Sequence, residues 1–202
     1  TYTDPDGLSG ANPVTSTVRT RDDDPPSSGT HYYVSPGGSD GNPGTSTTQP
    51  FQTIQQAADT AAAGDVVNIM PGTYHEEIRP ARSGTAHNYI TYRSYDMDNK
   101  AVIDGQKSLE YGFLISGTSY IRISGLVLQN TNHNNVGLFD AANYCIIEDS
   151  VLSEGGESWA HGGILINWAG NAPVVGTLIQ RNEITRYNSY SDQEMGIFFY
   201  NA

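Results

Sequence analysis

Acidic and basic residues recur in this sequence at a spacing that could bring them together. Residues 147–152 (IEDSVL) and 179–184 (IQRNEI) align with each other. If aligned positions stack, Asp149 lies beside Arg181, and Glu154 lies beside Arg186. A carboxylate beside a guanidinium could clamp a substrate, or the arginine could serve as a base. Asp149, Arg181 and Arg186 are therefore candidate catalytic residues. The alternative is two surface ion pairs, each contributing ~0–1 kcal/mol.

Ring-bearing side chains border the insertions in this pattern. Trp159, His161 and Trp168 flank them, and Tyr187 begins a tyrosine-rich stretch. Loops on a repetitive scaffold often line a groove, and aromatic faces stack on sugars. These four are candidate substrate-binding residues. Alternatively, the tryptophans cover the edge of the core, the tyrosines simply pack, and His161, which precedes two glycines, is a turn residue.

An internal repeat indicates which elements must position these side chains. Residues 123–128 align with 147–152 and, beyond an insertion, with 179–184, in units of about two dozen residues. A second anchor, a glycine followed by large apolar residues, recurs in step at Gly112, Gly137, Gly163 and Gly196. One unit cannot bury its apolar positions alone, but stacked units can. The repeat predicts an all-β, right-handed parallel β-helix rather than a sandwich.

Stacking predicts columns of like residues. Two inward columns consist of Ile123, Ile147 and Ile179, and of Leu128, Leu152 and Ile184. Cys145 falls in a third inward column, so we expect a buried thiol rather than a nucleophile. The column of Leu126, Ser150 and Asn182 suits a turn between strands.

The beginning of the chain differs from the repeats. Residues 1–30 are rich in Pro, Ser, Thr, Gly and Asp, which predicts an extended tail; 31–202 is the expected β-helix, incomplete at its C-terminus. Thr53 and Gln56 form a capping-box pattern before a helix over 54–62, and Gly64 suits the position after its end. This helix would cover the open end of the stack.

Charge and composition restrict the partners. The formal net charge is −12, and only 10 residues are Lys or Arg, which argues against nucleic acid. A polyanionic glycan would be repelled unless a cation such as Ca²⁺ bridged it, although the acidity can also be a solubilising surface. No apolar run is long enough for a membrane span. The single cysteine precludes an intrachain disulfide, and the chain begins like a mature product without a signal peptide.

The N-terminal half resembles a known family. Its motifs are YVSPGGSDGNPGT (33–45), PFQTIQQA (50–57), GD (64–65), PGTY (71–74) and VIDG (102–105). They resemble the cap and first coils of the pectate-lyase-like superfamily, closest in style to polysaccharide lyase family nine, over roughly residues 32–202. The resemblance implies a secreted carbohydrate-active protein, and it is more specific for fold than for activity.

The same resemblance implies a Ca²⁺ cofactor. Lyases of this type hold Ca²⁺ with acidic side chains and use Lys or Arg as base, so that a uronate carboxylate is neutralised while a neighbouring proton is removed. The Asp-Gly-Phe and Asp-Asp-Gly runs of the family are absent here. The nearest stretch begins at Asp192 and includes Glu194, which are the candidate metal ligands.

Three functions remain open at this point. The first is a Ca²⁺-assisted lyase acting on a uronate-containing polysaccharide. The second is a non-catalytic adhesin or filament subunit that assembles through its tail or the apolar C-terminal edge at 196–200. The third is a glycoside hydrolase, which needs two carboxylates about 5–10 Å apart; Glu148 or Asp149 could supply one.

Overall fold

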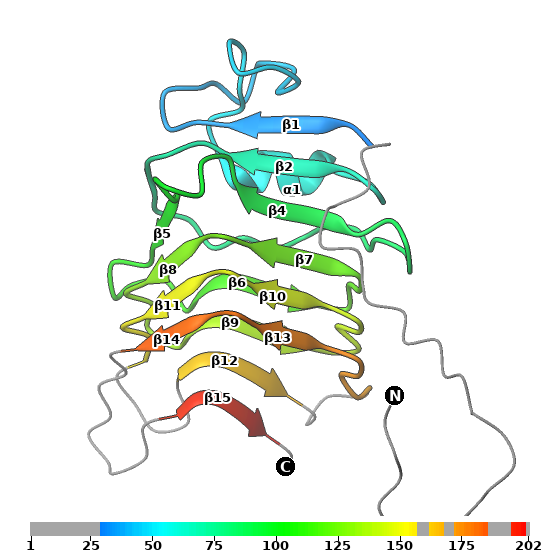
Figure 1. Ribbon diagram of the computed structural model, residues 1–202, viewed down its shortest axis with the longest axis vertical. Coiled ribbons are helices and arrows are strands. Elements are labelled where there is room, and N and C mark those ends of the chain that lie inside the picture. Colours follow the sequence, from blue (N-terminus) through cyan, green and yellow to red (C-terminus); the bar gives the residue numbers. More distant parts are fainter. Residues whose placement is uncertain (1–28, 157–161, 168–171, 186–194, 201–202) are drawn as a thin grey trace, which may run out of the picture.

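Short strands with alternating inward and outward side chains pair in parallel with their equivalents in the next coil of the chain. The computed structural model describes residues 29–156, 162–167, 172–185 and 195–200. These residues form a right-handed parallel β-helix, as the repeat predicts (Figure 1). Each full coil contributes one strand to each of three sheets, which we call sheets A, B and C.

Sheet A consists, in spatial order, of β1 (His31–Val34), β2 (Val66–Ile69), β4 (Ile90–Ser94), β7 (Ile121–Ser124), β10 (Ile146–Glu148) and β13 (Leu178–Gln180). Sheet B consists of β3 (Thr73–Tyr74), β5 (Val102–Asp104), β8 (Val127–Gln129), β11 (Val151–Ser153) and β14 (Glu183–Thr185). Sheet C consists of β6 (Tyr111–Ser116), β9 (Asn134–Phe139), β12 (Gly162–Asn167) and β15 (Met195–Tyr200).

The predicted inward columns are confirmed. Ile147 pairs with both Ile123 and Ile179, and the second column has the same register across β8, β11 and β14. Ile123 and Ile147 are fully buried. Cys145 is also fully buried, and burial raises the pKa of its thiol to about 11. The repeat therefore encodes the core directly, because equivalent side chains of successive coils fill one continuous interior.

A left-handed backbone position joins sheet A to sheet B. Gly125, Asp149 and Arg181 occupy it in three successive coils, with φ of 68°, 52° and 54°. Leu126, Ser150 and Asn182 follow this position, between the strands of the two sheets, so the turn expected at their column is present, and Leu126 is fully buried within it. The left-handed residue that precedes this column redirects the strand.

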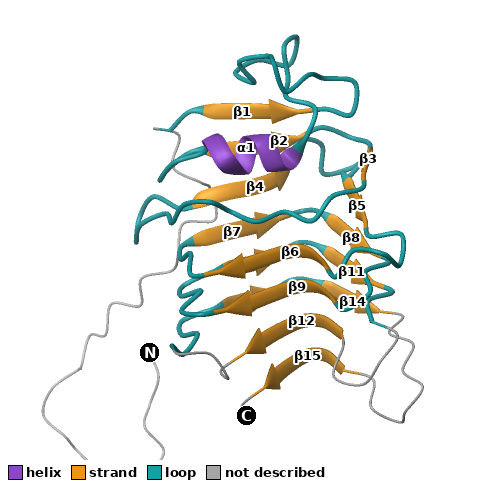
Figure 2. Cartoon of the chain, turned by 180° about the vertical axis from the view of Figure 1, so that it is seen from behind, coloured by secondary structure: helices purple, strands orange, loops and turns teal. Residues whose placement is uncertain are grey.

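The helix α1 (Ile54–Thr60) covers the end of the stack beside β1 and β2 (Figure 2). Its buried face consists of Ile54, Ala57 and Ala58. The helix is shorter than predicted because Ala61 turns to an extended ψ of 141°. The described part of the chain contains no helix whose length and apolar character would allow it to cross a membrane.

Only half of the predicted capping box is present. Thr53 Oγ1 accepts a hydrogen bond from the Gln56 N–H, at 3.2 Å. The Thr53 N–H donates to Asp40 instead of to Gln56. The first two helical N–H groups, of Ile54 and Gln55, donate to the Glu76 carboxylate, so distant acidic residues complete the cap.

Candidate functional site

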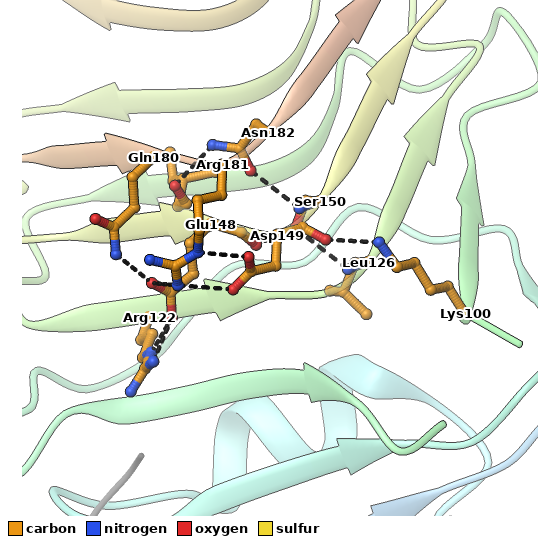
Figure 3. Close-up of polar contacts among 10 residues, drawn as sticks. Lys100, Arg122, Leu126, Glu148, Asp149, Ser150, Gln180, Arg181 and Asn182 are labelled. Carbon is orange, nitrogen blue, oxygen red and sulfur yellow. Dashed lines mark hydrogen bonds and ion pairs between the residues drawn. The ribbon is translucent and has the colours of Figure 1, made fainter. Parts of the chain in front are cut away.

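A charged network lies where sheet A turns into sheet B, and the solenoid register builds it. Glu148 ends β10 and pairs with Gln180 at the end of β13. The next residues, Asp149 and Arg181, therefore stack on each other in the left-handed position. Figure 3 shows that their side chains meet on the outside of the sheet.

Asp149 and Arg181 form a two-point ion pair. Arg181 Nε lies 2.7 Å from Asp149 Oδ1, and Nη2 lies 2.9 Å from Oδ2. Nη2 also contacts Glu148 Oε2 at 3.1 Å, so one guanidinium joins two carboxylates. Lys100 Nζ donates to the backbone oxygen of Asp149 at 2.7 Å. The contact predicted between Asp149 and Arg181 is thus present.

The deeper half of the network is buried. The Glu148 side chain is 1% exposed and forms an ion pair with Arg122, whose side chain is 8% exposed. Gln180 Nε2 donates to Glu148 Oε2 at 2.7 Å. Every described partner of Glu148 is a donor, which offsets the cost of burying its charge. Arg122, Gln180 and Lys100 were not predicted as site residues.

The alternation of inward and outward residues along β7 gives a weak indication that Arg122 belongs to the network. It lies between Ile121 and Ile123 on β7, so it must face outward, as Glu148 does on β10. The two are not register partners, since Arg122 pairs with Ile146. Their contact is diagonal and depends on the reach of two long side chains.

The charges around Arg181 favour a role as a fixed cation over a role as a base. Hydrogen bonds from Arg181 lower the pKa of Asp149, burial opposes this, and the charges of Arg181, Lys100 and Arg122 lower it further. An arginine guanidinium does not release its proton in proteins. The arrangement therefore suits a clamp for an anion better than a proton acceptor.

Most of the other predicted site residues lie outside the described residues. This applies to Arg186, Trp159, His161, Trp168 and Tyr187, and to the candidate metal ligands Asp192 and Glu194. Their roles remain predictions. Glu154, the expected partner of Arg186, accepts a hydrogen bond at its backbone oxygen from Lys107 Nζ, at 2.9 Å.

The described residues do not fit a Ca²⁺ site. Within these ranges, no three side chains of the His, Cys, Asp and Glu types lie close enough together to hold a metal ion. Glu148 and Asp149 are neutralised by Arg122 and Arg181. The Asp104 carboxylate accepts hydrogen bonds from Gln106, Gln129 and Asn130. A calcium ion needs several carboxylate or carbonyl oxygens together.

Comparison with known proteins agrees with the β-helix fold. The model of the family described as "Pel9A-like, right handed beta helix region" matches residues 32–197. The chain is 44% identical over 108 residues to the uncharacterized protein YwoF of Bacillus subtilis, covering 51% of the chain and 23% of YwoF. It is 40% identical over 77 residues to the pectate lyase PEL9 of Emericella nidulans, covering 37% and 18%. The chain thus spans about a fifth of these relatives.

Solved structures show the same fold. Pectate lyase Pel9A superimposes with a TM-score of 0.58 at 21% identity, covering 72% of this chain and 38% of that one. A rhamnogalacturonan lyase gives 0.59 at 18%, covering 85% and 54%. An alginate lyase from Paenibacillus sp. gives 0.55 at 22%, covering 64% and 40%. At such low identities the likeness concerns the fold.

Proposed function

The chain belongs to the Pel9A-like right handed beta helix family, and from that premise we propose that it is part of a secreted lyase acting on an acidic polysaccharide with the assistance of Ca²⁺. The matched relative named a pectate lyase supports the substrate class. The parallel β-helix supports it as well, since the solved neighbours named above include lyases of several polysaccharides.

The observation that carries the proposal is the charged network on sheet A. Lys100, Arg122 and Arg181 surround the carboxylates of Glu148 and Asp149, which leaves one positive charge in excess. The whole chain has a net charge of −12, so a local excess of positive charge is where a polyanion would approach. The Arg181 side chain is 48% exposed at this point.

In this proposal Arg181 binds and orients a uronate carboxylate. Asp149 and Glu148 fix the guanidinium, which lowers the entropy lost when a second anion binds. The elimination needs a separate base that removes the proton beside the carboxylate, while the bond to the leaving sugar oxygen breaks. Ca²⁺, which acidifies that C–H bond when bound, would be held by Asp192 and Glu194 or by residues of a longer parent.

The test measures lysis and binding separately. The chain, and any longer parent, is mixed with polygalacturonate, alginate and rhamnogalacturonan, with Ca²⁺ or with EDTA, and the ultraviolet absorbance of the unsaturated product is followed. We expect product that EDTA abolishes, and weaker polygalacturonate binding by Arg181→Ala. Lys107→Ala removes an exposed cation elsewhere and serves as the control. Absence of both product and binding with all three polymers would refute the proposal.

A second candidate function, self-assembly, is favoured by the exposed end of the stack. Ile197 and Phe199 continue the inward columns of Ile164 and Ile166 but are 38% and 72% exposed. Among the described strands, β13, β14 and β15 each pair on one side only. Such edges can pair with a second chain. Light scattering over a range of concentrations distinguishes the two: a monomer throughout argues against assembly.

A further inference from the structure

The outer face of sheet A is closed to solvent along four consecutive strands. Side chains of a strand alternate between the two faces, and Ile123 on β7 belongs to the core, so Arg122 beside it points outward. The register places Arg122 in one outward column with Val66 on β2, Thr91 on β4 and Ile146 on β10. We call these four residues the Val66 column. They are 6%, 0%, 1% and 4% exposed, respectively, although they point away from the core.

Sheet B provides a matched comparison for Val66. Val102, Val127 and Val151 form an outward column there, and each lies on a strand flanked by two others, as β2 is. All three valines remain partly exposed. Neighbouring strands alone therefore do not bury an outward valine. Figure 1 shows sheet A facing the viewer with no described helix or strand in front of it, so the burial of Val66 indicates a further covering segment.

A hydroxyl in the Val66 column points to a polar cover. Thr91 Oγ1 is buried and has no hydrogen-bond partner among the described residues. A buried polar group without a partner is costly, so a group that can bond to it is expected nearby. A peptide segment, which carries an amide or a carbonyl at each residue, supplies such groups.

The chain enters sheet A at the end of this column. Thr30, just before β1, accepts a hydrogen bond at its carbonyl from the Val66 N–H, at 2.9 Å. Gly29 packs so closely on the next coil that a Cβ there would lie 2.0 Å from the Gly64 oxygen. The segment that precedes Gly29 therefore starts beside β2, close to Val66. That segment is residues 1–28, which lie outside the described residues.

The length of this segment suits the column. The acidic run Asp22–Asp24 precedes Gly29 by five to seven residues, or about 17–23 Å of extended chain. From β2, the strands β7 and β10 are two and three coil spacings away, about 10 and 14 Å. Pro25 and Pro26 favour an extended chain between the run and Gly29. The run can therefore reach the level of Arg122.

The charges are complementary as well. Among the described strands of sheet A, the charged Arg and Glu side chains on the outer face are Arg93, Arg122 and Glu148. Two arginines against one glutamate leave an excess of positive charge. A run of three aspartates is attracted to such a face, and more strongly where the contact is closed to water.

We propose that residues 1–28 fold back along sheet A as a strap that covers the Val66 column, with Asp22–Asp24 beside Arg122. The strap then belongs to the folded domain, and it shields the outer face of the solenoid from solvent. The column ends at β13, where Leu178 is partly exposed and the Arg181 side chain is 48% exposed. The strap thus leaves the Arg181 guanidinium accessible, and its docking requires neither lysis nor Ca²⁺.

Disulfide trapping in the full chain tests this docking. Asp23→Cys is combined with Ser124→Cys, on the outer face of β7, or with Gln129→Cys, on the outer face of β8 in the same coil; Ser124 and Gln129 are both partly exposed. The native Cys145 is buried and stays in place. Under mild oxidation, the intramolecular disulfide should form about tenfold faster with position 124 than with position 129, as measured on non-reducing gels.

Equal rates at the two positions overturn the proposal, because a tail that does not dock would favour neither sheet. Disulfide-linked dimers as the main product overturn it as well, since they would place the tail of a second chain on this face. Mass spectrometry of the cleaved peptides confirms which cysteines are joined.

Removal of the charges is a second measurement that introduces no thiol. The triple variant Asp22→Asn, Asp23→Asn and Asp24→Asn should lower the thermal unfolding midpoint by about 2–4 °C. The control is Asp4→Asn with Asp6→Asn, which removes charges farther along the same tail and should leave the midpoint unchanged. A fall in the triple variant alone supports the strap, and equal midpoints for the two variants contradict it.

Discussion

Asp149 and Arg181 stand one above the other in successive coils, both with a left-handed backbone, and bind each other at two points of 2.7 and 2.9 Å. The pair lies at the surface, whereas Glu148, which shares Arg181 with Asp149, is buried. Removing a partner of the buried Glu148 therefore costs more stability than removing a partner of the partly exposed Asp149.

Arg122→Met should destabilise the chain much more than Arg181→Met. Removing Arg122 deprives the buried Glu148 of its closest partner and is expected to cost about 3 kcal/mol in the free energy of unfolding. Removing the half-exposed Arg181 should cost about 1 kcal/mol or less. Guanidinium unfolding curves measure both. Equal losses would contradict the assignment of Glu148 as the buried centre.

Asp149→Asn should make the free energy of unfolding depend less on pH in the acid range. The folded chain holds the pKa of Asp149 below its unfolded value, so this contribution is fully present above about pH 4 and disappears as the pH falls through the folded pKa. Urea midpoints between about pH 5 and pH 3 test this. Asp98→Asn, in an exposed loop, is the control; identical acid profiles for the two variants would contradict the expectation.

Ile147→Ala should be among the more damaging core substitutions. Its side chain is fully buried between Ile123 and Ile179, so truncation leaves a cavity and is expected to cost about 3–4 kcal/mol. Ile197→Ala, at the partly exposed end of another inward column, should cost about 1 kcal/mol. Denaturant midpoints check both, and a small effect at Ile147 would argue against the stacked register.

Cys145 should be unreactive in the folded chain. Its thiol is buried and its pKa is raised to about 11, so little thiolate forms near neutral pH. A chromogenic disulfide reagent should label one thiol per chain in denaturant and almost none without it. Rapid labelling under native conditions would show that this part of the core opens readily.

The position of the helix cap illustrates where sequence reasoning succeeds and where it stops. Thr53 was identifiable as the N-cap from its type and place. Asp40 and Glu76, which satisfy the Thr53, Ile54 and Gln55 N–H groups, come from loops on either side of the helix. A local motif cannot reveal acceptors that only the folding of those loops brings near.

The repeat by itself determined the β-helix, the inward columns and the pairing of Asp149 with Arg181, because stacking converts equal sequence position into spatial contact. Only the tertiary structure decided that Arg122 reaches diagonally to Glu148, and that Tyr111 and Phe139 close over Gly137. These contacts join positions that are not equivalent in the repeat. They depend on side-chain length and direction, which periodicity does not encode.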